Sequence, residues 1–144
     1  KWHGMATAMR SDQGEALVAG LDRDGFGAML RSAADFDDAT LDAFWHPFAN
    51  GRGRRATLEF YRSMDFEKLA PYEGKLAELG VPVLLLWGET DEFAPLAGAR
   101  RFEREIPGSR LVAVEGAGHF IYDEYPGRCA REVADFLANA SAAR

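Results

Sequence analysis

The sequence predicts an α/β protein in which a helical region precedes a strand–helix–strand–helix segment of a parallel sheet. Three observations support this fold class. Residues 1–79 contain short helical patterns and no convincing strand, the run 83–87 is continuously apolar, and a second strand-like segment lies at 110–115 after an amphipathic helical pattern. Parallel strands need a crossover of this kind between them.

The first half is expected to form five short helices with apolar residues at helical spacing. They span residues 15–21, 25–33, 40–48, 50–63 and 73–79. Asp24 is a candidate N-cap for the second of them. The third carries an aromatic cluster around Trp45, and Gly80 and Pro82 end the fifth.

The second half has the pattern of a buried parallel sheet. Residues 83–87 read as a strand covered on both faces, because the run is apolar throughout and ends at Gly88. Pro95 suits the first position of the next helix, and Pro126 opens the last one. Two strands leave both faces and edges of a sheet uncovered, so we expect further strands from outside this sequence.

Composition excludes several functional classes. With 144 residues, 47% hydrophobic and a net charge of −6, the chain reads as a globular protein that does not bind nucleic acid. No apolar run of about 20 residues indicates a membrane span, and no signal peptide is apparent, so a cytoplasmic location is expected. The single cysteine, Cys129, excludes an internal disulfide and a cysteine-rich metal site. We expect no metal and no cofactor.

Two loops follow the two predicted strands and carry the candidate chemistry. Asp91 lies in the first loop, and His119 lies in the second between Gly118 and Phe120. The carboxyl ends of parallel strands meet at one edge, so these side chains are expected to be neighbours. A carboxylate on one imidazole nitrogen fixes the tautomer and lets the other nitrogen move a proton. The pair therefore indicates an acid–base site.

These stretches resemble a known family. The segments VPVLLLWGETDEFAP and VEGAGHFIYDEYPGRCAREVADFL are similar to the C-terminal end of α/β-hydrolase-fold proteins, in the branch of epoxide hydrolases and haloalkane dehalogenases. The resemblance implies that Asp91 is the acid and His119 the histidine of a catalytic triad. It also implies a helical cap, or lid, at residues 1–79 and the C-terminal part of the hydrolase core at 80–144, with the N-terminal strands absent.

Three aromatic residues are candidate substrate contacts. In TLEFYRSMDF, Tyr61 matches a cap tyrosine that hydrogen-bonds the epoxide oxygen in epoxide hydrolases, although core packing is the alternative. Trp45 is either a wall of the substrate site or part of the cap core, and Phe120 follows the predicted catalytic histidine. For the acid, Glu89 and Glu92 are alternatives to Asp91, which could instead cap the helix near Pro95.

The resemblance also implies a nucleophile upstream of this chain, because the family order is nucleophile, acid, histidine. No serine here has the glycines of a G-x-S-x-G elbow. We therefore expect a hydrolase of a small, largely apolar ester, epoxide or halide, with Ser or Asp as the missing nucleophile. The alternative is a catalytically incomplete fragment or ligand-binding module that needs an N-terminal partner. Pairing with such a segment, or a homo-oligomer, would cover the exposed sheet edge.

Overall fold

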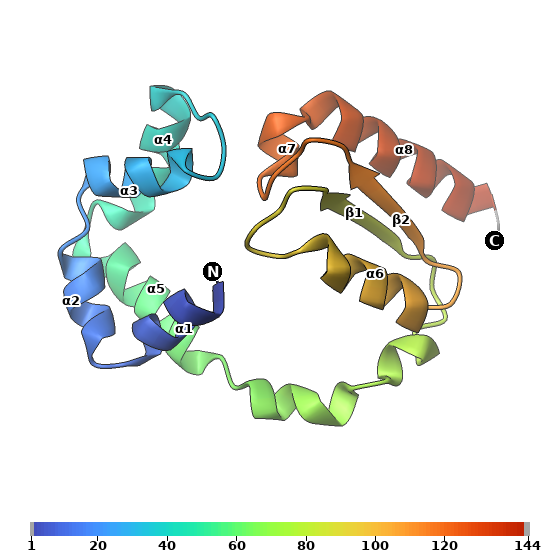
Figure 1. Ribbon diagram of the computed structural model, residues 1–144, viewed down its shortest axis with the longest axis horizontal. Coiled ribbons are helices and arrows are strands. Elements are labelled where there is room, and N and C mark those ends of the chain that lie inside the picture. Colours follow the sequence, from blue (N-terminus) through green and yellow to red (C-terminus); the bar gives the residue numbers. More distant parts are fainter. Residues whose placement is uncertain (1, 143–144) are drawn as a thin grey trace. The chain divides into compact units, whose positions relative to one another are not determined.

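The computed structural model describes residues 2–142, and the chain forms two compact units, Lys1–Leu69 and Ala70–Arg144 (Figure 1). We call them the helical unit and the α/β unit and describe each by itself. The parallel pair of strands predicted from the sequence lies in the second unit. The division into cap and core predicted between residues 79 and 80 stays a prediction.

The helical unit consists of short α-helices and 3₁₀ turns. In chain order these are α1 Trp2–Arg10, α2 Gln13–Ala19, α3 Arg23–Arg31, α4 Asp38–Trp45, η1 His46–Phe48 and α5 Gly51–Ser63, followed by the turn η2 Phe66–Tyr72, which leads into the α/β unit. The sequence did not predict α1. The predicted cap of α3 was also wrong, because Asp22 and not Asp24 accepts the hydrogen bond from the Gly25 amide, at 2.8 Å. The helix therefore begins two residues earlier than expected.

Helix α5 lies against α1, α2 and η1 and forms the centre of the helical unit. Its Leu58 is buried, as are Val18 of α2 and Leu41 of α4. The Asn50 side chain caps the start of α5 by accepting the amides of Arg52 and Gly53 at 3.0 and 3.1 Å. This start agrees with the sequence prediction.

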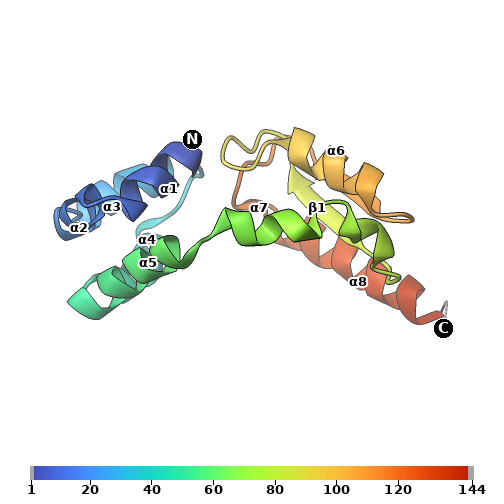
Figure 2. The ribbon, with the colours of Figure 1, turned by 90° about the horizontal axis from the view of Figure 1, so that it is seen from below.

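The α/β unit contains the sheet and the helices that flank it. Its elements are η3 Lys75–Glu78, β1 Leu84–Gly88, α6 Leu96–Glu105, β2 Arg110–Val114, α7 Ile121–Glu124 and α8 Pro126–Ala142. The strands are parallel and paired from Leu84 with Arg110 to Gly88 with Val114. Figures 1 and 2 show α6 on one side of the strands and α8 on the other. Among the described residues, no helix has the length and apolarity needed to cross a membrane.

Several local expectations for this unit were wrong. The helix predicted at 73–79 is reduced to the 3₁₀ turn η3, and Pro95 precedes α6 as its N-cap. The short helix α7 was not predicted. The side chains of Leu84, Leu85 and Leu86 are half-buried, not fully buried as the apolar run suggested. A two-stranded sheet leaves part of its surface uncovered, which explains this exposure.

The core of the α/β unit lies near the carboxyl ends of the strands. Val114, Ala117, Ile121 and Cys129 form a buried cluster, and Leu86 packs against it. The Cys129 thiol donates a hydrogen bond to the Ile121 carbonyl at 3.3 Å and so ties α8 to α7. Burial raises the pKa of this thiol, which therefore stays protonated at neutral pH. This core supports the loop between β2 and α7.

Candidate active site

The two loops that follow β1 and β2 lie side by side, as the parallel pairing requires. The Glu89 amide donates to the Val114 carbonyl at 3.1 Å, and the Thr90 amide donates to the Ala117 carbonyl at 2.9 Å. These contacts join the start of the first loop to the start of the second. The loop that contains Asp91 is therefore held next to the loop that contains His119.

Asp91 and His119 form a direct pair. His119 Nδ1 lies 2.9 Å from Asp91 Oδ2, across 28 residues of sequence. An ionised carboxylate only accepts hydrogen bonds, so the geometry requires the proton on Nδ1. The pairing leaves Nε2 of the imidazole as the nitrogen for proton transfer.

The second oxygen of Asp91 is also occupied. Asp91 Oδ1 accepts the amides of Phe93 and Ala94, each at 2.8 Å, and only 6% of the side chain is exposed. The carboxylate thus holds the turn before α6 with one oxygen and His119 with the other. The sequence analysis treated these two roles as alternatives. Glu89, considered as another partner for the histidine, instead accepts the Gly116 amide at 3.3 Å.

The His119 ring contacts two aromatic side chains and remains accessible. The ring centroids of Phe93 and Phe120 are 5.1 and 5.3 Å from that of the imidazole. The His119 side chain is 41% exposed, in contrast to the buried Asp91. Phe120 therefore contacts the predicted catalytic histidine. Phe93 also contacts His119, and this contact was not predicted from the sequence. Its position two residues after Asp91 could have indicated it.

Tyr61 lies in the helical unit and lines an apolar pocket of about 350 Å³. Three of the four methionines, Met5, Met9 and Met29, line the same pocket. Burial raises the pKa of the Tyr61 phenol, so the hydroxyl stays protonated at neutral pH. A protonated phenol in apolar surroundings can donate a hydrogen bond to a polar atom of a ligand.

Trp45 lies in an aromatic cluster of the helical unit. Its ring centroid is 5.5 Å from that of Phe26 and 6.5 Å from that of Phe48, and the Arg54 guanidinium lies 5.6 Å from the Trp45 ring centroid. Trp45 is not among the residues that line the Tyr61 pocket. Its contacts favour the packing alternative, and its role as a substrate contact stays a prediction.

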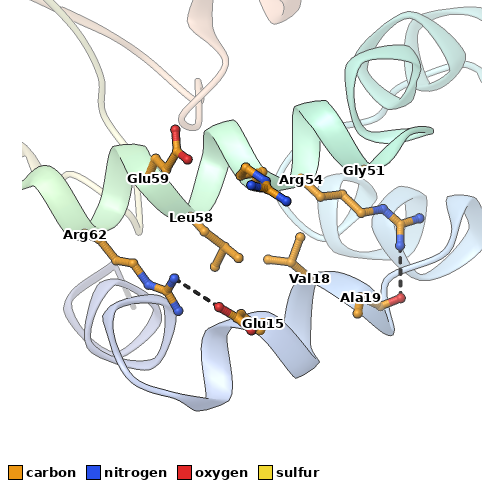
Figure 3. A pocket seen from close by; sticks show the side chains of 9 residues that line it. Glu15, Val18, Ala19, Gly51, Arg54, Leu58, Glu59 and Arg62 are labelled. Carbon is orange, nitrogen blue, oxygen red and sulfur yellow. Dashed lines mark hydrogen bonds and ion pairs between the residues drawn. The ribbon is translucent and has the colours of Figure 1, made fainter.

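A second hollow, of about 540 Å³, lies between α2 and α5 (Figure 3). Val18 and Leu58 point toward one another across it. Charged contacts connect the two helices here: Arg62 pairs with Glu15 at 3.2 Å, and Arg54 donates to the Ala19 carbonyl at 3.0 Å. These contacts join α2 to α5 and explain the polar rim of the hollow. None of the site residues predicted from the sequence lines this hollow.

Within the part of the chain that the structure describes, no three His, Cys, Asp or Glu side chains come together in a way that could hold a metal ion.

A comparison with family models decides the affiliation of the chain. The model described as TAP-like protein, one of the α/β-hydrolase (abhydrolase) models, matches residues 62–144, more than half of the chain. The chain belongs to this α/β-hydrolase family. The matched region contains β1, β2 and the Asp91–His119 pair, and the resemblance drawn from the sequence is confirmed.

Curated relatives of this α/β-hydrolase chain carry several hydrolase names. It is 29% identical over 119 residues to epoxide hydrolase 2 of Caenorhabditis elegans. The aligned region covers 83% of this chain and 32% of the relative. It is 30% identical over 108 residues to a 2-hydroxy-6-oxononadienedioate/2-hydroxy-6-oxononatrienedioate hydrolase of Cupriavidus pinatubonensis, covering 73% of this chain and 37% of the relative. The chain thus spans about a third of the length of these proteins.

Solved structures agree on the fold. The crystal structure of haloalkane dehalogenase DbeA from Bradyrhizobium elkani matches with a TM-score of 0.82 at 21% identity, over 98% of this chain and 52% of that one. The likeness places the chain in the α/β-hydrolase fold, and the predicted fold class is confirmed. At this identity the match is one of fold.

Proposed function

We propose that this chain supplies the acid–histidine pair of the catalytic triad of an α/β-fold hydrolase whose nucleophile precedes residue 1. The observation that carries the proposal is the 2.9 Å contact between His119 Nδ1 and the buried Asp91 carboxylate. Membership of the α/β-hydrolase family and the hydrolase names of the relatives support it. The nucleophile is Ser, or Asp as in the epoxide and halide branch.

The proposal gives each member of the pair a role that its geometry supports. The nucleophile attacks a carbon of the substrate, the bond from that carbon to the leaving alcohol, halide or epoxide oxygen breaks, and a covalent ester intermediate forms. His119 Nε2 takes a proton from water, and the hydroxide that results attacks the ester and releases the nucleophile. Asp91 keeps the proton on Nδ1 and stabilises the imidazolium during this step. With a serine nucleophile, His119 also removes the serine proton in the first step and passes it to the leaving group.

The substrate proposed is small and largely apolar. The helical unit has an apolar pocket beside Tyr61 that fits a ligand of this class, because its lining is dominated by methionine, leucine and phenylalanine side chains. Its volume of about 350 Å³ lies at the lower end of the range usual for small-molecule sites, roughly 300–1,000 Å³. In the proposal Tyr61 donates its hydroxyl to an oxygen of a ligand in this pocket. Phe120, in the α/β unit, borders the group that reacts at His119. Trp45 contacts Phe26 and Phe48, which line this pocket, and in the proposal it supports the pocket through them.

The test is turnover by the longer protein that joins this chain to the predicted upstream segment. His119→Ala should lower kcat by about 10³-fold or more towards esters, epoxides or haloalkanes, whichever the protein hydrolyses. The matched control is His46→Ala, which changes an exposed histidine of the helical unit and should leave kcat unchanged. Near-wild-type turnover by His119→Ala would reject the assignment.

The mass of the native protein decides whether this test applies. A mass well above that of 144 residues, with a G-x-S-x-G or G-x-D-x-G elbow upstream, supports the hydrolase. A native chain of 144 residues would support the alternative, a binding module or partner-dependent piece. The same panel of substrates then separates esterase, epoxide hydrolase and dehalogenase, because each releases a different product.

A further inference from the structure

One peptide group beside His119 is held at both of its ends. The carbonyl of Ala117 accepts two hydrogen bonds from Thr90, one from its amide and one from Oγ1, each at 2.9 Å. The amide of Gly118 belongs to the same peptide group and donates to both carboxylate oxygens of Glu124, at 3.2 and 3.1 Å. Thr90 comes from the first loop, and Glu124 comes from α7.

The end of β1 packs closely against this peptide group. A Cβ added to Gly88 would overlap the Gly118 carbonyl oxygen and lie 2.7 Å from the Ala117 carbonyl oxygen. Ala117 itself is fully buried in the core of the α/β unit. The peptide group is therefore confined sterically as well as by hydrogen bonds.

The contacts of Thr90 and Glu124 with the Ala117–Gly118 peptide group form a clamp on the backbone directly before His119. A peptide group is planar, so contacts that fix its C=O and its N–H fix the orientation of the whole group. The Gly118 amide lies one residue before His119, and the intervening glycine has no side chain to restrict its own dihedral angles. The accessible ring is held by the Nδ1 hydrogen bond to Asp91 and by contacts with Phe93 and Phe120, so a shift of its backbone is expected to weaken the hydrogen bond to Asp91.

We propose that Thr90 and Glu124 are positioning residues that hold His119 in place for its contact with Asp91. They act through the Ala117–Gly118 peptide group, Thr90 at its carbonyl and Glu124 at its amide. Their importance for catalysis rests on the proposed role of His119. Misplacement of a catalytic group by about 1 Å can cost about 10²-fold in rate, so a clamp on the backbone is functionally relevant.

The test reads the state of the imidazole directly. The ¹⁵N-labelled 144-residue chain is compared with Thr90→Val and Glu124→Ala in long-range ¹H–¹⁵N spectra, in mildly alkaline buffer. In the wild type, His119 should give two well-separated ring nitrogen signals, because Asp91 selects the tautomer with the proton on Nδ1. In both variants these signals should move towards each other as the second tautomer becomes populated. His46 serves as the internal reference.

Three variants separate positioning from a general loss of structure. Thr90→Ser keeps the hydroxyl and Glu124→Gln keeps one acceptor oxygen, so both should retain the wild-type His119 signals. Asp123→Ala removes an exposed carboxylate from the same helix and should also change nothing. Thr90→Val keeps the main-chain hydrogen bond and so carries the test alone if Glu124→Ala does not fold.

The proposal is overturned if Thr90→Val and Glu124→Ala shift the Gly118 amide signal but leave the His119 ring signals unchanged. This outcome differs from failure of the proposed function. Full turnover by His119→Ala would reject catalysis by His119, whatever the spectra show, and unchanged spectra would reject only the clamp.

Discussion

The helical unit and the α/β unit fix their backbones in different ways. In the helical unit, helices α3, α4 and α5 begin at side-chain caps, where Asp22, Asp37 and Asn50 accept amides two or three residues further along the chain. In the α/β unit, α6 and α7 lack such caps on the preceding residue. The loops there are held by contacts between distant residues, such as Thr90 with Ala117 and Asp91 with His119, 27 and 28 residues apart. Local caps therefore begin helices in the helical unit, where long-range contacts such as that of Arg54 with Ala19 join one helix to another. In the α/β unit, long-range contacts hold the loops of the candidate site themselves.

The largest effect on the difference between the two units is expected from a substitution that separates the two loops after β1 and β2. Gly88→Ala adds a Cβ that overlaps the Gly118 carbonyl oxygen, although Gly88 has no positive φ that would exclude alanine. We expect the free energy of unfolding of the α/β unit to fall by about 1–3 kcal/mol. Amide hydrogen exchange measures this, with lost protection in β1 and β2.

A matched variant addresses the helical unit. Gly53→Ala places a Cβ on the Pro47 carbonyl oxygen and should destabilise α5 by a similar amount, about 1–3 kcal/mol. Each variant should lower protection mainly in its own unit. Equal loss of protection in both units by either variant would contradict the description of two separately stabilised parts.

A smaller effect is expected at a helix cap. Asn50→Ala removes the acceptor for the amides of Arg52 and Gly53, and should cost the helical unit about 1 kcal/mol. Urea unfolding followed by circular dichroism gives this value. Asn139→Ala, at an exposed position of α8, is the control and should be neutral within about 0.5 kcal/mol. A control that is as costly as Asn50→Ala would remove the cap as the explanation.

One glycine of the α/β unit should tolerate what Gly88 does not. Gly98 lies in α6, and nothing lies within 4 Å of an added Cβ. Gly98→Ala should therefore stabilise the unit by roughly 0.5–1 kcal/mol, because alanine loses less backbone entropy in a helix. The midpoint of urea unfolding should rise. A fall similar to that of Gly88→Ala would show that crowding does not decide the difference.

The smallest effect on stability is expected from removing the charge of Asp38, and this effect should depend on pH. Hydrogen bonds from Arg31 and Arg23 lower the pKa of Asp38 in the folded helical unit. A lowered folded-state pKa gives stability that is present above the ordinary value of about 3.9 and is lost as pH falls through the lowered pKa. Asp38→Asn should thus lower Tm slightly near neutral pH and have no effect at strongly acidic pH. The exposed Asp35 provides the control, Asp35→Asn, and a difference in Tm that persists in strong acid would exclude the ion pairs as its origin.

The sequence was informative where local rules or strand geometry apply. The cap at Asn50 follows from the residue type, and the meeting of Asp91 with His119 follows from parallel strands that end at one edge. The sequence was less informative where two candidates lie close together. Asp22 and Asp24 both suit an N-cap, and only the backbone conformation of Asp22 decides between them.

The parts that were missed depend on loop conformation or on what covers a surface. The contacts of Thr90 with Ala117 and of Glu124 with Gly118 form only once the turns have formed, so no spacing of residues in the sequence predicts them. The partial exposure of β1 was missed because an apolar run specifies a preference for burial, whereas the neighbouring elements determine the burial achieved.

The most direct test of the account is kcat for Asp91→Asn in the longer protein that carries the upstream nucleophile. An asparagine keeps the shape of the side chain but no longer selects the tautomer of His119, so kcat should fall by about 10⁴-fold. The control Asp135→Asn, at an exposed carboxylate of α8, should retain full activity. A kcat for Asp91→Asn equal to that of the wild type would contradict the claim that Asp91 and His119 act together as the acid–histidine pair of a hydrolase.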